Sequence, residues 1–356
     1  MIANKKSNRA DNIDVLKAIC AFLIVCIHIP FPGTIGDYFT VLTRIAVPIF
    51  FMITGYFYID TVKRGRELYQ IKKIFILVVS ANLIWLLWDA FCAAIRSGMG
   101  SFFNRFTVKN LLKFLILNES PFSGHLWYLG AILYVLIIVL IADRLHCRKI
   151  IYFLIPLLLI GDLAFGKYSI VIWGQEFLYI IVRNFLFVGL PYFCIGQIIR
   201  NGKIFRRIRE IRKSYLCLII CIFAATSLME RFILVCTGMN AIRDHYISTT
   251  FLAVAVFMFF LKGNESDNII ASDRQNENKV MRVLRIIGRR YSTWLYILHP
   301  MFITCFGFWA EKTGVYSIYR IIAPFMVYVG TLIFLVLVEQ VKKLFIRKRL
   351  CNKRGL

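Results

Sequence analysis

The chain has 356 residues, 59% of them hydrophobic, and a mean hydropathy of +0.70. This composition excludes an ordinary soluble domain and is typical of a polytopic helical membrane protein, because backbone exposed to lipid must hydrogen-bond to itself. The formal net charge of +25 does not indicate a nucleic-acid partner, since the basic residues gather in alternate loops.

Apolar segments along the chain predict an all-α fold with about ten transmembrane helices. They lie at roughly 13–32, 39–60, 71–95, 126–143, 149–165, 178–199, 214–236, 246–261, 291–309 and 319–340. We therefore expect an N-terminal tail at 1–12, a transmembrane domain at 13–340 with a polar loop at about 262–290, and a basic tail at 341–356.

Charge in the connecting segments predicts the orientation. The two tails and four of the loops hold 32 of the 44 Lys and Arg residues, whereas the intervening loops hold seven. This asymmetry places both termini in the cytoplasm. The polar stretch from Gly263 to Lys279 is expected to be mobile. The semi-apolar stretch from Val108 to Leu117 is expected to lie along the membrane interface.

The first apolar segment, N-I-D-V-L-K-A-I-C-A-F-L-I-V-C-I-H, carries charged residues. On a helix, Asp14, Lys17, Ala21 and His28 share one stripe. Asp14 and Lys17 are spaced to neutralise each other. An imidazole within a membrane helix is costly and by default marks a functional site. The alternative is that His28 only hydrogen-bonds a neighbouring helix.

Polar residues of the later helices lie mainly in the extracytoplasmic half of the predicted topology. The candidates for a shared polar cavity are Arg44, His125, Trp127, Arg183, Asn184, Glu230 and Arg231. The alternative is a set of structural ion pairs, of Arg44 or Arg183 with Asp89 or Glu230. Three residues at helix ends are interpreted as snorkelling side chains: Asp244, His245 and Arg320.

Such a cavity would suit an anionic or carbonyl-bearing ligand. A histidine can act as general base on an acceptor hydroxyl, and arginines can hold a carboxylate, a phosphate or an oxyanion. The sequence has no G-x-S-x-G motif, and its ten cysteines show no metal-ligand spacing, so neither a serine hydrolase nor a metal site is predicted. His299, next to Pro300, is interpreted as a partner of a helix kink.

Several motifs resemble the acyltransferase-3 family of integral membrane acyltransferases. They are the first-helix segment ending in His28, R-I-A-V-P-I-F-F-M-I-T-G-Y-F from Arg44, H-L-W-Y-L from His125, R-N-F-L-F-V-G-L-P-Y-F-C-I-G from Arg183, and W-L-Y-I-L-H-P from Trp294. The combination is most similar to the membrane half of vancomycin-resistance membrane-bound serine racemases.

The resemblance implies a multi-pass enzyme of the bacterial plasma membrane. It would transfer an acyl group, usually acetyl, from cytoplasmic acyl-CoA to a hydroxyl of a cell-envelope glycan or a peptidoglycan precursor. His28 matches the family's essential histidine, and Arg44 is a second catalytic candidate. Predicted substrate-binding residues are Asp14, Lys17, Lys73, His125, Trp127, Arg183, Asn184, Glu230 and Arg231.

One departure keeps a second function open. The family's R-x-x-R donor motif is replaced here by Lys73 and Ile76, and lysine lacks the bidentate fork of arginine. The serine-racemase membrane halves are associated with supplying L-serine to a racemase. The alternative is therefore an L-serine uptake or binding module, with the carboxylate on Arg44 or Arg183 and a serine racemase as partner. A purely structural anchor is a weaker interpretation, because an anchor needs no converging charges.

Overall fold

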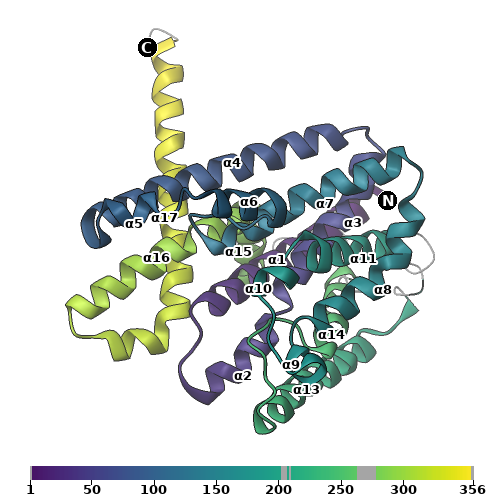
Figure 1. Ribbon diagram of the computed structural model, residues 1–356. Coiled ribbons are helices and arrows are strands. Elements are labelled where there is room, and N and C mark those ends of the chain that lie inside the picture. Colours follow the sequence, from purple (N-terminus) through teal and green to yellow (C-terminus); the bar gives the residue numbers. More distant parts are fainter. Residues whose placement is uncertain (1, 202–206, 208–209, 263–277, 354–356) are drawn as a thin grey trace. The chain divides into compact units, whose positions relative to one another are not determined.

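The computed structural model describes residues 2–201, 207, 210–262 and 278–353, and this described part is α-helical without a strand (Figure 1). The prediction for the polar stretch from Gly263 falls almost wholly outside it. The chain divides into two compact units. Unit 1 comprises Met1–Thr43 and Glu265–Leu356, and unit 2 comprises Arg44–Asn264.

Unit 1 is built around α1 (Ile2–His28), which contacts helices from the other end of the chain. The further elements of this unit are α2 (Gly33–Thr43), α15 (Lys279–Ile286), the π-helical turn η6 (Ile287–Tyr291), α16 (Ser292–Lys312) and α17 (Tyr316–Lys353). Its apolar core joins Val25 and Ile29 of α1 to Ala310, Ala323 and Val327.

Gly288 explains how η6 approaches α1. A Cβ atom at this position would lie 1.7 Å from the carbonyl oxygen of Asp14, so the two backbones touch where glycine stands. Small residues permit such close helix contacts in membrane proteins, where packing replaces the hydrophobic effect between helices. Tyr328 of α17 adds a hydrogen bond to the Ala18 carbonyl at 3.2 Å.

Unit 2 contains the helices that hold the polar pocket described below. Its elements are α3 (Ala46–Val62), α4 (Glu67–Cys92), η1 (Ala93–Ser97), α5 (Met99–Phe103), α6 (Val108–Leu117), η2 (Gly124–Leu126), α7 (Trp127–Arg144), α8 (Arg148–Ala164), α9 (Ser169–Trp173), α10 (Tyr179–Val182), η3 (Phe185–Gly189), α11 (Leu190–Arg200), α13 (Lys213–Cys236) and α14 (Ile247–Lys262).

Helices α3 and α11 pack together through glycines from both sides (Figure 1). A Cβ at Gly55 would lie 1.9 Å from the Phe193 carbonyl oxygen, and one at Gly196 would lie 2.1 Å from that of Met52. The pair α13 and α14 is joined by the hydroxyls of Ser227 and Ser248, 2.7 Å apart. Buried polar side chains thus find partners on the adjacent helix, as lipid surroundings require.

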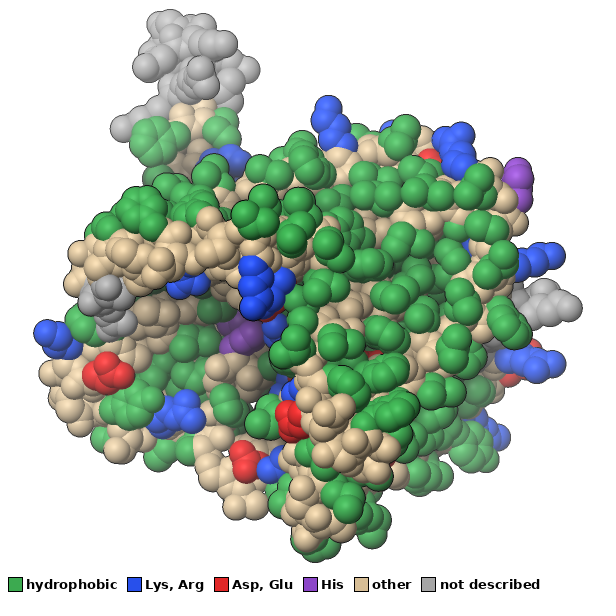
Figure 2. Space-filling model, in the orientation of Figure 1, with side chains coloured by type: hydrophobic (Ala, Val, Ile, Leu, Met, Phe, Trp, Pro, Cys, Tyr) green, Lys and Arg blue, Asp and Glu red, His purple; other side chains and the backbone are tan. Residues whose placement is uncertain are grey.

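Six helical stretches of the described chain are long and apolar enough to cross a membrane: Gly33–Val62, Glu67–Ile95, Gly124–Arg144, Tyr179–Arg200, Lys213–Cys236 and Tyr316–Ile346. Hydrophobic side chains cover much of the face drawn in Figure 2. Large apolar residues such as Phe75, Leu83 and Phe153 are exposed. The chain is a multi-pass, all-α membrane protein, as the sequence predicts.

The remaining predicted segments are also helical, at α1, α8, α14 and α16. The count of ten spans and the cytoplasmic termini stay predictions, as do the domain boundaries at residues 12 and 340. The stretch Val108–Leu117 forms a helix, α6, on which no residue is buried. Its place along the membrane interface stays a prediction.

A glycine pair in unit 1 tests the close approach of η6 to α1. We expect Gly288→Ala to lower the free energy of unfolding by roughly 1–3 kcal/mol, because the added methyl group would collide with backbone. Gly307→Ala is the matched control, since its Cβ would meet nothing within 4 Å, and alanine favours the helix by about 1 kcal/mol. Thermal unfolding in detergent compares them, and equal stability of the two variants would contradict the packing.

Candidate functional site

The charged residues of α1 form a network within unit 1. Lys17 donates to Asp14 at 3.0 Å, which confirms the predicted pair. Arg289 of η6 donates to Asp14 at 2.8 Å and to Asp11 at 2.6 Å. The π-helical turn at η6 therefore supplies a second cation that the sequence did not predict for this carboxylate.

His28 is the last residue of α1 and its side chain is exposed. Its ring centroid lies 5.0 Å from that of His299 in α16. His299 is fully buried, and its Nδ1 lies 3.0 Å from the Leu295 carbonyl oxygen. Because a carbonyl only accepts, Nδ1 of His299 carries the proton. Unit 1 thus holds two adjacent imidazoles, one accessible and one fixed by the helix backbone.

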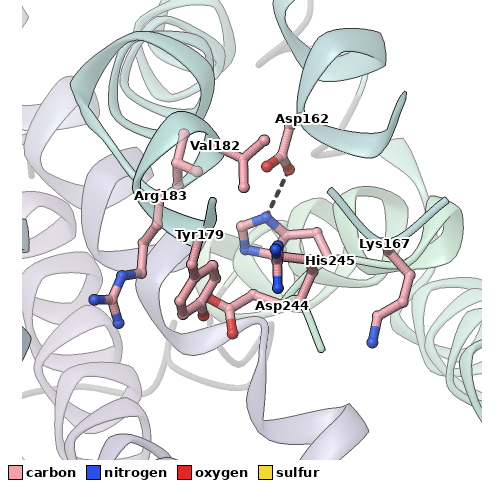
Figure 3. Close-up of a pocket in the computed structure, with 9 residues that line it drawn as sticks. Asp162, Lys167, Tyr179, Val182, Arg183, Asp244 and His245 are labelled. Carbon is pink, nitrogen blue, oxygen red and sulfur yellow. Dashed lines mark hydrogen bonds and ion pairs between the residues drawn. The ribbon is translucent and has the colours of Figure 1, made fainter. Parts of the chain in front are cut away.

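In unit 2, two of the predicted arginines stand beside an acidic loop. Arg44 forms an ion pair with Asp244. The guanidinium of Arg183 lies over the Tyr179 ring, 4.4 Å from its centroid, and 5.7 Å from that of Trp127. The side chains of Tyr179 and Asp244 lie next to each other (Figure 3). Arg44, Arg183 and Trp127 are therefore brought together by residues 179 and 244, which the prediction did not include.

The ion pairs proposed as an alternative have other partners. Arg44 pairs with Asp244 rather than with Asp89 or Glu230, and Asp89 pairs with Arg105 at 2.5 Å. Glu230 accepts the backbone N–H groups of Ile247 and Ser248, at 2.9 and 3.1 Å. It thus caps the N-terminus of α14, where a carboxylate is favourable. The predicted partners are wrong because residue 244 lies in a loop whose path the sequence does not reveal.

The other predicted residues of unit 2 have largely local contacts. Asn184 caps η3 by accepting from the backbone of Leu186 at 2.8 Å. His125 is buried, with Nδ1 2.7 Å from the Ser123 hydroxyl. Arg231 bonds the Tyr246 hydroxyl, and Lys73 is exposed on α4. Their roles toward a substrate stay predictions.

A polar pocket in unit 2 is lined by Asp162, Lys167, Tyr179, Val182, Arg183, Val188, Arg243, Asp244 and His245 (Figure 3). Its empty space, open solvent included, is about 210 Å³, and the enclosed part has room for only about one water-sized group. The side chains come from α8, α10, η3 and the two loops that precede α9 and α14. Such a space suits one small polar group rather than a large molecule.

The centre of this pocket is a histidine held by a carboxylate. Nδ1 of His245 donates to Asp162 at 2.7 Å, and both side chains are 6% exposed. Burial alone would lower the pKa of His245, but the Asp162 and Asp244 carboxylates outweigh it and raise this pKa above its ordinary value. The interpretation of His245 as a snorkelling side chain is therefore wrong, because the ring is enclosed and paired.

Lys167 stands at another side of the pocket. Its ammonium donates to the Ala241 carbonyl at 2.7 Å and to the Asn240 side chain at 3.3 Å. Burial lowers the pKa of Lys167 to about 8, and the positive charge of Arg44 acts in the same direction. Of the pocket residues that the sequence analysis did not name, Asp162 carries a signal, because it is a carboxylate inside an apolar segment. No group of three or more metal-binding side chains occurs among the described residues.

Comparison with known families decides the identity of the fold. Residues 11–340 match the family described as "Acyltransferase domain". The chain belongs to the acyltransferase-3 family. Its acyltransferase domain thus extends over both units, and includes His28, Arg44 and the pocket of unit 2. Membership of this family implies an acyl donor and a membrane-embedded transfer reaction.

A curated relative is named "Serine/alanine racemase" and comes from Enterococcus gallinarum. The acyltransferase chain is 24% identical to it over 324 residues, which is 85% of this chain. The match spans 42% of the relative's length. No solved structure matches the chain.

Arg44 and Asp244 are expected to stabilise unit 2 jointly, because each charge compensates the other. Removing one partner, in Arg44→Gln or Asp244→Asn, leaves a partly buried charge and should cost roughly 3 kcal/mol of unfolding free energy. The double variant should cost clearly less than the sum of the two. Denaturation of the purified protein measures this coupling.

Lys113→Gln is the control for that cycle. Lys113 and Glu119 are 3.9 Å apart and half-exposed, so the loss of the Lys113 charge should change stability much less than the loss of Arg44. Additive effects of Arg44→Gln and Asp244→Asn would contradict a direct ion pair.

Proposed function

We propose that this protein is an O-acyltransferase, which moves an acetyl group from cytoplasmic acetyl-CoA to a hydroxyl of a cell-envelope glycan or a peptidoglycan precursor. The observation that carries the proposal is the family match over residues 11–340. That range contains an accessible histidine, His28, beside a second, buried imidazole. The donor, the acceptor and the role of His28 are parts of the proposal.

In the proposed reaction, His28 acts as general base. Its imidazole accepts the proton of the acceptor hydroxyl while the oxygen attacks the thioester carbonyl carbon. The carbon–sulfur bond then breaks, the CoA thiolate leaves, and the imidazolium returns the proton to it. The exposed His28 side chain at the end of α1 is accessible to an acceptor. The hydrogen bond from Nδ1 of His299 to the Leu295 carbonyl fixes the His299 ring beside His28.

Arg44 is proposed to stabilise the oxyanion that forms on the carbonyl oxygen. A guanidinium has five N–H donors, and the bond from Nη1 of Arg44 to Asp244 uses one of them. Further substrate contacts belonging to this proposal are those of Asp14, Lys17, Lys73, His125, Trp127, Arg183, Asn184, Glu230 and Arg231. His28 belongs to unit 1 and Arg44 to unit 2.

Acylation of surface glycan tests the role of His28. Cells that express the protein should acylate their glycan, and His28→Ala should lower this acylation by about 100-fold or more, because a general base contributes that much. His146→Ala is the matched control, since His146 is an exposed loop histidine outside both centres. Equal acylation by wild type and His28→Ala, at equal expression, would remove His28 from the mechanism.

A second function is favoured by the relative named for a serine/alanine racemase. In this alternative the membrane domain takes up or binds L-serine, with the carboxylate on Arg44 or Arg183, and serves a serine racemase. Vesicles that contain the purified protein should then accumulate labelled L-serine above empty vesicles, and Arg183→Gln should reduce the excess by about tenfold. Uptake equal to that of empty vesicles contradicts this alternative.

A further inference from the structure

The pocket of unit 2 contains more positive than negative side chains. Three cations in or next to the pocket have a carboxylate partner: Arg44, which is not a lining residue, with Asp244, Arg243 with Glu176 and His245 with Asp162. Lys167 and Arg183 remain, and neither has a carboxylate partner among the residues that the structure describes. With His245 protonated, the group therefore carries an excess of two positive charges.

The hydrogen bond to Asp162 orients the His245 ring in the pocket. Because Nδ1 is bonded to Asp162, the ring turns its other nitrogen, Nε2, away from that carboxylate and toward the pocket side (Figure 3). Nε2 makes no hydrogen bond to any part of the chain that the structure describes. A carboxylate fixes the orientation and charge of an imidazole in this way in many functional sites. The protonated ring thus presents one N–H donor to whatever enters.

Arg183 offers a second donor surface. Its guanidinium rests on the ring of Tyr179 and beside Trp127, and aromatic stacking leaves the N–H edge of a guanidinium open. Within the described chain the side chain of Arg183 has these ring contacts and no hydrogen-bond acceptor. A planar guanidinium with open N–H groups matches the two oxygens of a carboxylate or phosphate.

We propose that the unit 2 pocket is a binding site for a small oxyanion, which accepts a hydrogen bond from Nε2 of His245 and is held by the charges of Arg183 and Lys167. The enclosed part of the pocket has room for about one water-sized group, so it can take one oxygen of a carboxylate or phosphate and no large body. This site does not involve His28, and it shares Arg183 with the substrate contacts proposed above. The experiment below measures anion binding without an acyl-transfer or uptake readout, so its failure is distinguishable from failure of the proposed function.

Binding at this site depends on pH. The groups that face or surround His245 are Asp162, Asp244, Arg44, Tyr179, Lys167 and Tyr192. His245 and Lys167 lose their positive charges as the pH rises through the raised imidazole pKa and through about 8. The anion should therefore bind tightly at about pH 6 and weaken progressively by about pH 9, because the charges that hold it disappear.

Calorimetric titration of the purified protein in detergent tests the site. The probes are sodium propionate, inorganic phosphate and coenzyme A, each against sodium chloride at equal ionic strength. His245→Asn and Arg183→Gln should each weaken binding by about tenfold, since each removes a charge-assisted hydrogen bond. The matched controls His146→Asn and Arg144→Gln remove exposed charges of the same kinds and should leave affinity unchanged.

The probes distinguish the source of the anion. Propionate binding indicates a free carboxylate, whereas binding of phosphate or coenzyme A alone indicates a phosphate-bearing ligand, and both support an oxyanion site. The proposal is overturned if no probe binds more tightly than chloride. It is also overturned if affinity in the wild type does not fall between pH 6 and pH 9. Because the affinity of the wild-type protein is measured from pH 6 to pH 9, the site is tested even if a variant fails to fold.

Discussion

The cost of an unpaired charge in apolar surroundings is the constraint on which this structure depends. Several buried carboxylates described here are held by cations or by backbone N–H groups, because water is not available to them. Asp14 is held by Lys17 and Arg289, Asp162 by His245, and Glu230 by the first N–H groups of α14. These contacts join α1 to η6, α8 to the loop before α14, and α13 to α14.

Close packing at glycines is the second feature that holds neighbouring helices together. Where Gly288 meets α1, and where Gly55 and Gly196 join α3 to α11, backbones touch and polar side chains reach across short distances. The contact between α1 and η6 shows the consequence, because Arg289 of η6 donates hydrogen bonds to both Asp11 and Asp14 of α1. Packing and charge pairing thus support each other, because neither persists in lipid without the other.

The two units present different chemistry. Unit 1 has the accessible His28 beside the buried His299, an arrangement suited to proton transfer at an exposed position. Unit 2 has an enclosed histidine whose charge is maintained by Asp162, surrounded by further cations. The family match extends over both units and so includes both centres.

The sequence by itself determined that this is an all-α membrane protein and placed its helices, because long apolar runs can only satisfy their backbone as helices. It also identified the family and the Asp14–Lys17 pair, and it singled out Arg44 and Arg183 as candidates, since charges inside apolar segments are conspicuous. Only the tertiary structure decided the partners. The residues that complete the unit 2 pocket, such as Lys167, Asp244 and His245, lie in loops or at helix ends. Charged residues are common in loops and at helix ends, so the sequence does not distinguish these. They become informative only when the fold encloses them beside a second charged side chain.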